Sequence, residues 1–293
     1  MKITIEVGTA DQKNIIENEL RLVQTIIGAF EPAINIGQVI VPADFDQKVN
    51  ELQNTDYYKS VRGVVALAKI IEIEDGIAMI LSPRIYTVEW DIQTRVFIYL
   101  HEILHAANER WIPKPEIKSP SLSLYFENIY RLFDEYAADR QALELIDKVF
   151  PLKSDRMRCS IDSNVDGFIR IINNQQYYEQ IAKEITSFRI RDSDVTKFLE
   201  NTHDSFSEVA MSIAHLYSYI DNYPGYQSKL ADLHNSRFVN NKTYALIDFF
   251  RKKYGEKRPE LVEGLNLVKE FMLNFGMRFE DTPEGLYCHV LDI

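Results

Sequence analysis

The feature that most constrains this chain is a polar group of residues inside a strongly apolar segment. His101, Glu102 and His105 belong to the pentapeptide His-Glu-Ile-Leu-His, and the segment around them predicts a helix over residues 90–110. In a helix of about 3.6 residues per turn, positions i and i+4 return to nearly the same side. The two imidazoles therefore point the same way, one turn apart. The surrounding residues are apolar: Val96, Phe97, Ile98, Leu100, Ile103, Leu104, Ala106 and Ala107.

Polar groups in such a helix are costly to bury unless they are paired or bound to a cation. Two histidines at this spacing can offer two nitrogen ligands to one metal ion. Glu102 lies about 100° further round the helix, beside the ion, where it can act as a general base. The pentapeptide therefore predicts zinc-dependent hydrolysis, most often of a peptide bond. The alternative is an amphipathic helix with two hydrogen-bonded histidines and no metal.

Composition narrows the class of protein. The chain has 293 residues, of which 46% are hydrophobic, so one large or two modest domains are expected. The net charge of −11 argues against a nucleic-acid partner, because phosphate binding needs a basic face.

No segment reaches the roughly 20 apolar residues of a membrane span, and the N-terminus lacks the apolar stretch of a signal peptide. Cys159 and Cys288 form no Cys-x-x-Cys pair, which argues against a disulfide framework or a thiolate metal site. We expect a cytoplasmic protein without membrane insertion.

The order of the expected elements predicts an α+β fold. Asp44 is expected to cap the second helix, and Glu74-Asp75-Gly76 predicts a hairpin turn between the last two strands. The patterns predict strands over 2–7, 38–41, 64–73 and 77–81, and helices over 11–29, 43–52 and 90–110. After a proline-rich loop they predict only helices, over 125–149, 168–188, 195–220, 244–254 and 261–275. We predict a domain over residues 1–150 with a small mixed or antiparallel sheet, and a mainly helical domain over 151–293 packed on it.

A catalytic zinc site needs a third protein ligand, and the helix expected over 125–149 offers one. Glu135 and Asp139 are four residues apart and share a face. Glu135 is expected to bind the metal, and Asp139 to accept the ring N–H of a ligating histidine. Asp134 is an alternative ligand that requires a different rotation of the helix. A second alternative is that these acids form only a solvated helix face.

These motifs resemble those of the gluzincin metallopeptidases, in which His-Glu-x-x-His is followed by Glu-x-x-Ala-Asp. The stretch from Glu135 to Arg140 is similar to the form found in the CAAX-prenyl-protease family and its soluble relatives. The step of 30 residues from His105 to Glu135 is closer to the soluble ImmA/IrrE-like metallopeptidases. The resemblance covers roughly residues 60–150. It implies a zincin-like metallopeptidase domain over residues 1–150 that binds Zn²⁺ through His101, His105 and Glu135, with Asp139 as the supporting acid.

Other zinc families fit less well. A metzincin needs a glycine three residues after the second histidine and a third histidine three residues later. This chain has Asn108 and Trp111 at those positions, which excludes that family. No helix-turn-helix signature accompanies the metallopeptidase motifs, so cleavage of a transcriptional regulator is not implied.

In the implied mechanism, a water activated by the metal attacks the peptide carbonyl while Glu102 serves as general base. A further side chain should stabilise the oxyanion. In gluzincins a residue of a later helix does so, and the candidates are His203 and His215, with His234 and Tyr136 weaker. Residues 77–81 are expected to form a sheet edge that pairs with an extended peptide or protein substrate.

Two other functions remain open at this point. The chain could be a non-catalytic binding or structural module that retains the zincin fold and its metal. It could also be a helical interaction protein in which the motif is fortuitous. An intact Glu102 favours catalysis, because a purely structural metal site has no need of a general base.

Overall fold

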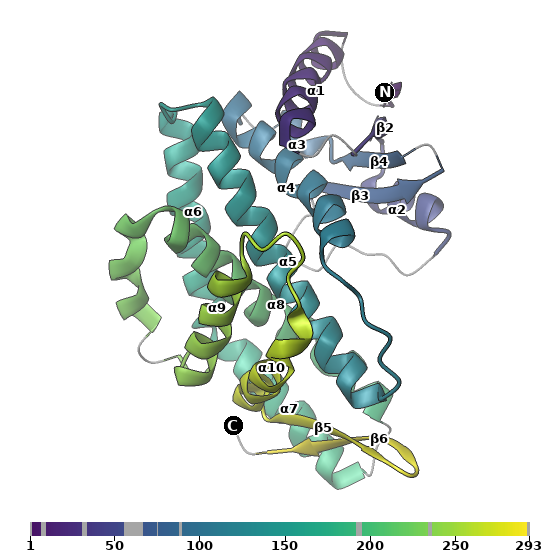
Figure 1. Cartoon of the computed structure of the whole chain (residues 1–293), viewed down its shortest axis with the longest axis vertical. Helices are drawn as coiled ribbons and strands as arrows, with labels where there is room; N and C mark the ends of the chain where they lie inside the picture. Colours follow the sequence, from purple (N-terminus) through teal and green to yellow (C-terminus); the bar gives the residue numbers. More distant parts are fainter. Residues whose placement is uncertain are drawn as a thin grey trace. The chain divides into compact units, whose positions relative to one another are not determined.

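The computed structural model describes residues 2–6, 10–30, 34–55, 67–74, 76–87, 90–191, 195–233 and 236–291. It is a mixed α+β structure with a small sheet and a mainly helical C-terminal half, which confirms the expected class. The chain forms two compact units (Figure 1). The first comprises Met1–Arg110 and Gln141–Ile161, and the second comprises Trp111–Arg140 and Asp162–Ile293. The units alternate along the chain, and the domain boundary expected at residue 150 stays a prediction.

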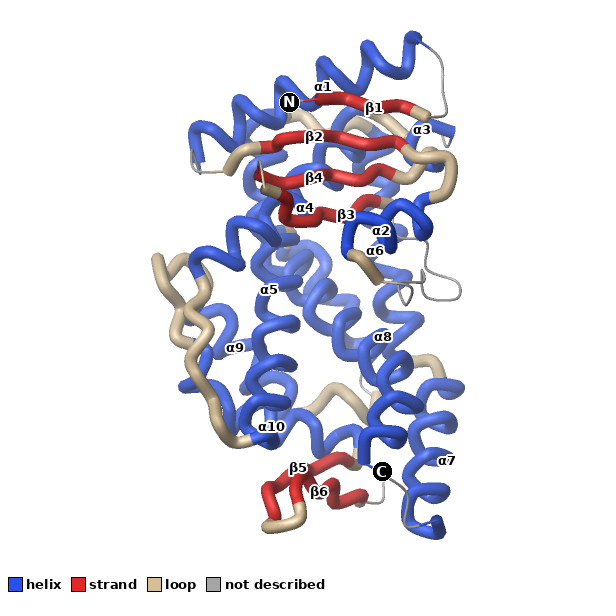
Figure 2. The backbone as a smooth tube through the Cα atoms, turned by 90° about the vertical axis from the view of Figure 1, so that its right-hand side faces the viewer, coloured by secondary structure: helices blue, strands red, loops and turns tan. Residues whose placement is uncertain are grey.

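The first unit contains a four-stranded mixed sheet in the order β1-β2-β4-β3, visible as four red strands in Figure 2. The strands are β1 (Lys2–Ile5), β2 (Ile36–Val41), β3 (Ala68–Ile73) and β4 (Gly76–Leu81). β1, β2 and β4 are parallel to one another, whereas β3 returns antiparallel to β4. The expected hairpin between the last two strands is therefore present. Asp75 and residues 64–66 of the expected strand lie outside the described residues.

The prediction that residues 77–81 form the edge of the sheet is wrong. β4 pairs with β2 on one side and with β3 on the other, so its backbone hydrogen-bonding groups are used within the sheet. Ile77 to Leu81 are all buried. A continuous apolar run is typical of a strand that is covered on both faces. β4 is thus a central strand.

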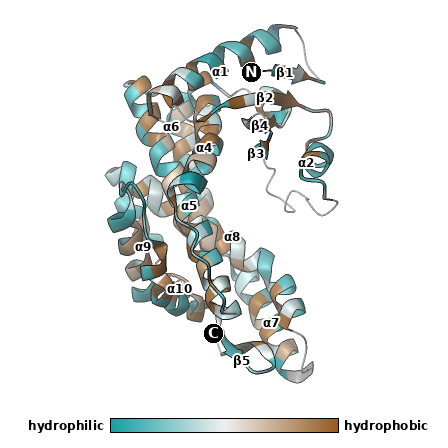
Figure 3. Cartoon of the chain, turned by 45° about the vertical axis from the view of Figure 1, so that its right-hand side comes forward, coloured by the Kyte–Doolittle hydropathy of each residue, from teal (hydrophilic) through white to brown (hydrophobic). Residues whose placement is uncertain are grey.

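Helices cover the sheet within this unit. α2 (Phe45–Gln53) packs on one face, where Val49 contacts Ile71 of β3 and Ile80 of β4. Asp44 caps this helix as expected, since its side chain accepts the Gln47 N–H at 3.0 Å. α1 (Ala10–Phe30) and α4 (Ile92–Trp111) lie on the opposite side of the sheet from α2. In Figure 3, the colours of α2 are mostly those of hydrophilic residues, whereas the end of β2 that precedes it is hydrophobic.

Buried polar contacts fix α4, the helix that carries the pentapeptide. Asp91 accepts the Thr94 N–H at 3.0 Å at its start. One turn on, Arg95 donates to Glu19 of α1 through both Nε and Nη2. Glu19 is 3% exposed, and such a bidentate pair is directional as well as strong. These contacts tie the first turns of α4 to α1.

The second unit is mainly helical. α5 (Pro120–Val149) begins with a proline at its first position, where the missing N–H costs nothing, and its last turns belong to the first unit. The helix expected over 168–188 is two helices, α6 (Asp155–Ile172) and α7 (Gln175–Arg191), separated by Asn173 and Asn174. The remaining elements are α8 (Val195–Asn222), η1 (Pro224–Leu233), α9 (Asn241–Lys253), η2 (Leu261–Gly264), α10 (Leu265–Met272) and η3 (Leu273–Phe275).

The expectation that the C-terminal half contains only helices is wrong. β5 (Met277–Thr282) and β6 (Gly285–Val290) form an antiparallel hairpin. Along β5, buried residues alternate with more exposed ones, and Phe279 is one of the buried residues. Within the described ranges, none of the helices combines the length and the apolar character of a membrane span.

Candidate metal centre

His101 and His105 lie side by side on α4 with both imidazoles directed to the same side, as the helical spacing predicts. Their Nε2 atoms are 3.1 Å apart. The ring centroids are 4.6 Å apart and the ring planes are almost perpendicular, at 88°. Both histidines are half-buried, whereas Ile103 and Leu104 between them are buried. The two apolar residues of the pentapeptide are therefore packed inside the protein, and its two histidines lie together on a partly exposed side of the helix.

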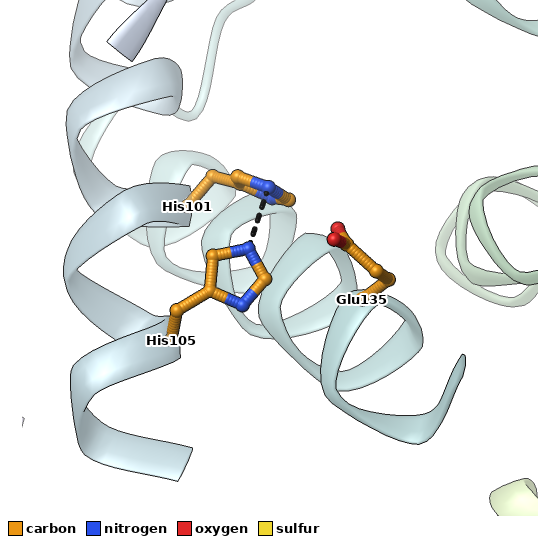
Figure 4. Close-up of side chains that lie close together, drawn as sticks. All are labelled: His101, His105 and Glu135. Atoms are coloured by element: carbon orange, nitrogen blue, oxygen red, sulfur yellow. Dashed lines mark hydrogen bonds between the residues drawn. The ribbon is translucent and has the colours of Figure 1, made fainter. Parts of the chain in front are cut away.

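Glu135 of α5 joins this pair. One nitrogen of each histidine and one carboxylate oxygen of Glu135 all lie within 4.8 Å of one another (Figure 4). α5 is a continuous helix that enters the first compact unit at Gln141. Within the part of the chain that the structure describes, this is the group of three side chains that could hold a metal ion. Asp134, the alternative ligand, is not a member of it.

The donor set fits zinc. Two imidazole nitrogens and one carboxylate oxygen are ligands of catalytic zinc sites, which leave a fourth position open. Zinc–nitrogen bonds of about 2.0–2.1 Å at a tetrahedral angle place two nitrogens about 3.3 Å apart. The 3.1 Å between the two Nε2 atoms is close to that value. All three residues are half-buried, which leaves the group partly open to solvent.

Asp139, one turn beyond Glu135 on α5, is the buried acid of the site. Only 4% of its side chain is exposed. Its Oδ2 accepts a hydrogen bond from His215 Nδ1 at 2.7 Å and another from the Ser218 hydroxyl at 3.1 Å. A buried carboxylate needs such donors to offset its lost hydration. The partner identified here is His215 of α8, and the expected bond from Asp139 to a zinc-ligating histidine stays a prediction.

His215 is held on three sides. Its Nδ1 bonds to Asp139, and its Nε2 lies 3.7 Å from Glu135 Oε2. Phe168 of α6 stacks on the imidazole, with ring centroids 5.1 Å apart and planes inclined by 16°. Because the carboxylate accepts, Nδ1 must carry a proton, and Nε2 is the nitrogen that faces Glu135. Of the two histidines proposed for the oxyanion, His215 is thus the one that contacts a candidate ligand.

His203 lies on a different part of α8 and is 55% exposed. Its ring contacts Arg131, Asp204 and Ser207 at 3.3–3.5 Å. It is three turns of helix away from His215, or roughly 18 Å. Its assignment to the oxyanion stays a prediction, and its observed contacts are those of a surface residue.

The weaker oxyanion candidates have less support. The Tyr136 hydroxyl donates to Asp221 at 2.6 Å and accepts from Arg140 at 2.7 Å. Burial, together with the hydrogen bond to Asp221, raises the pKa of Tyr136 well above its ordinary value. Arg251 of α9 donates to the same Asp221 carboxylate at 2.8 Å, so the hydroxyl is part of an ion-pair network on α5, α8 and α9. His234 lies outside the described residues.

Glu102 is half-buried on α4, next to His101 in the sequence. Its role as the base stays a prediction that follows from helical spacing.

Two residues that sequence reasoning missed complete the surroundings of His215. Ser218 lies one turn beyond it on α8, a spacing that could have suggested a shared partner. Phe168 comes from α6, and nothing in the local pattern indicates that it stacks on His215. Such a contact depends on how α6 and α8 pack, which the sequence of neither helix specifies.

The chain matches no protein-family model, and searches among curated proteins and among solved structures likewise returned no match. The function must therefore be inferred from the side chains of α4, α5 and α8.

Proposed function

We propose that this protein is a zinc-dependent metallopeptidase whose ligands are His101, His105 and Glu135. The observation that supports the proposal is the convergence of two imidazole nitrogens and a carboxylate oxygen within 4.8 Å. A hydrogen-bonded acid lies one helical turn from the proposed carboxylate ligand. When bound, zinc would supply a Lewis acid that polarises the scissile carbonyl and lowers the pKa of water.

Glu102 is the proposed general base. It lies on the same helix as both histidines, about 100° from His101, and its carboxylate can take a proton from the attacking water. The same group can then deliver that proton to the leaving amine, so that one carboxyl serves both halves of the reaction. A structural zinc site requires no such group, which is why Glu102 favours catalysis over metal binding alone.

His215 is the proposed group for the oxyanion. Asp139 and Phe168 hold the imidazole in one orientation. The side chain therefore loses no further freedom when Nε2 binds the oxyanion. Since Nδ1 is engaged with Asp139, His215 can donate from Nε2 only when the ring is protonated. A protonated ring would add a positive charge where negative charge develops on the substrate.

Zinc binding tests the site. Titration of the metal-free chain with zinc, followed by calorimetry, should show one tight site that is lost in Glu135→Ala. His203→Gln is the matched control, because His203 is exposed and lies outside the proposed group. Equal zinc affinity in Glu135→Ala and the wild type would place the third ligand elsewhere, with Asp134 as the next residue to test.

Cleavage of a peptide library tests the chemistry. The zinc-loaded wild type should cleave peptides, whereas Glu102→Gln should bind zinc equally well and lose activity by about a hundredfold or more. Equal cleavage by both proteins would exclude Glu102 as the base. If zinc binds to both and neither cleaves any peptide, the chain is a metal-binding module rather than a peptidase.

A further inference from the structure

A second feature of the molecule lies wholly in the second unit, and none of its lining residues is proposed to bind zinc. A groove of about 720 Å³ runs beside strand β6. Its opposite wall is formed by the end of α7 and the start of α8. The residues that line it are Phe188, Arg189, Val195, Thr196, Leu199, Leu286, Tyr287, Cys288, His289 and Val290.

The groove follows the edge of β6 rather than one of its faces. Successive side chains of a strand point to opposite faces, so a groove over one face touches every second residue. Here five consecutive residues, 286–290, line it. Contact with every residue in a row is expected when a groove runs along the edge of a strand, where the outward-pointing backbone N–H and C=O groups lie.

The hydrogen bonds of the hairpin show which backbone groups face this edge. In an antiparallel pair, the N–H and C=O of alternate residues point toward the partner and away from it. Leu291 N donates to Gly276 O at 2.8 Å, so positions 289 and 287 also face β5. Cys288 and Leu286 then point their backbone groups outward, as does Val290, whose carbonyl accepts from Arg189 Nη2 at 2.9 Å.

The other edge of the hairpin is already covered. Phe279 of β5 is opposite Cys288, and its N–H and C=O both bond to the Tyr125 hydroxyl of α5, at 2.6 and 3.1 Å. On β6, by contrast, no described group bonds to the backbone of Leu286 or Cys288. β6 is therefore an edge strand with outward donors and acceptors beside a groove.

The charges of the groove favour one kind of occupant. Arg189 contributes a positive charge to it and none of the described lining residues is acidic, although the chain as a whole carries a net charge of −11. His289 also lines the groove, with its Nε2 paired to the Glu280 carboxylate of β5 at 2.5 Å. The wall opposite β6 adds apolar side chains from Phe188, Val195 and Leu199. Five residues of strand span about 17 Å.

We propose that this groove binds an extended acidic peptide segment, which adds to β6 as a third strand. Backbone hydrogen bonds to Leu286 and Cys288 supply the pairing, and the side chains opposite provide the selectivity for acidic and apolar residues. The proposal is independent of the zinc site, and either can fail without the other.

The test uses the full chain and a labelled heptapeptide, acetyl-Thr-Glu-Val-Glu-Val-Glu-Thr-amide, followed by fluorescence anisotropy. Methylation of alternate backbone nitrogens removes the donors needed for strand pairing and leaves the side chains unchanged. The methylated peptide should bind at least about tenfold more weakly. A peptide in which lysine replaces each glutamate should bind at least about fivefold more weakly than the acidic peptide. Equal binding of the methylated peptide would overturn strand addition, and no binding of the acidic peptide would overturn the proposal as a whole.

A pair of variants locates the binding in the groove. Thr196 is exposed on the α8 wall, so replacing it should not disturb the core. Thr196→Glu should weaken binding of the acidic peptide several-fold through charge repulsion, whereas Thr196→Gln, of nearly the same size, should bind like the wild type. Arg158→Gln, at a 65% exposed arginine of the other unit, serves as the control for net charge. Equal affinity in Thr196→Glu and Thr196→Gln would show that the peptide binds elsewhere.

Discussion

At the scale of single residues, the contact between Asp139 and His215 carries a prediction about stability. Asp139→Asn replaces a buried carboxylate that accepts two hydrogen bonds by an amide of the same shape. The charge-assisted bond to His215 is lost, and the free energy of unfolding should fall by about 1–3 kcal/mol. Urea denaturation measures the change, and Asp204→Asn, at a side chain 73% exposed, should have almost no effect. If both variants unfold alike, the His215 contact does not stabilise the fold.

A second residue, Glu208 of α8, should make stability depend on pH. Burial and the charge of Asp204 raise the pKa of Glu208 above its ordinary value of 4.5. The folded chain then holds this proton at pH values where the unfolded chain has released it. Stability from this group is therefore complete below pH 4.5 and is lost as the pH rises through the folded pKa.

The test is Glu208→Gln, which cannot ionise. Relative to the wild type, this variant should gain in free energy of unfolding as the pH rises from about 4 to about 8. Urea denaturation at several pH values measures the difference, and Glu200→Gln, at an exposed position of the same helix, is the control. A difference that stays constant with pH would contradict the raised pKa.

The residues of the site were predictable to different degrees. His101, His105 and Glu135 could be paired from the sequence because each spacing within a helix fixes a face, and the structure brings the three together. The environment of His215 could not be predicted. It depends on Asp139, Ser218 and Phe168, which lie on three helices, and a helical period does not specify which helices become neighbours.

At the scale of elements, the β3–β4 hairpin depends on Gly76. This residue has φ = 125°, and a Cβ added to it would lie 2.4 Å from the Asn35 carbonyl oxygen. That oxygen accepts the Ile77 N–H at 3.0 Å, so it cannot move without loss of a hydrogen bond. Gly76→Ala should lower the free energy of unfolding by more than about 1 kcal/mol.

Gly28 of α1 provides a matched control for this prediction. A Cβ at Gly28 meets nothing within 4 Å, and alanine favours a helix by about 0.5–1 kcal/mol over glycine. The same substitution should therefore stabilise the chain there, and urea denaturation of both variants measures the two signs. Destabilisation of equal size at both positions would show that backbone conformation at Gly76 is not the cause.

The elements show where local patterns predict a fold and where they do not. The cap at Asp44 and the β3–β4 hairpin follow from local residues, and both are present. The central position of β4 could not be predicted, because it depends on parallel pairing with β2, some 40 residues earlier in the chain. The β5–β6 hairpin could have been found, since Met277 and Phe279 alternate with polar residues and Gly285 follows the turn.

At the scale of the whole molecule, the proposed zinc site should couple metal binding to the stability of the chain. A ligand that binds only the folded state raises the free energy of unfolding by RT ln(1 + [L]/Kd), or about 2.7 kcal/mol at a hundredfold excess over Kd. The zinc ligands come from two different helices, α4 and α5, and Glu135 follows His105 by 30 residues, so the unfolded chain has no preformed site. The unfolding temperature of the metal-free wild type should therefore rise with zinc concentration.

Two comparisons make this prediction specific, and scanning calorimetry measures both. His105→Asn and Glu135→Ala should lose most of the rise, whereas Glu102→Gln should keep it, because Glu102 is proposed as a base and not as a ligand. Magnesium should give no comparable rise, since it prefers oxygen ligands to imidazole. If zinc raised the unfolding temperature of Glu135→Ala as much as that of the wild type, the metal would be bound without the Glu135 carboxylate. The third ligand would then be another residue, with Asp134 of the same helix as the next to test.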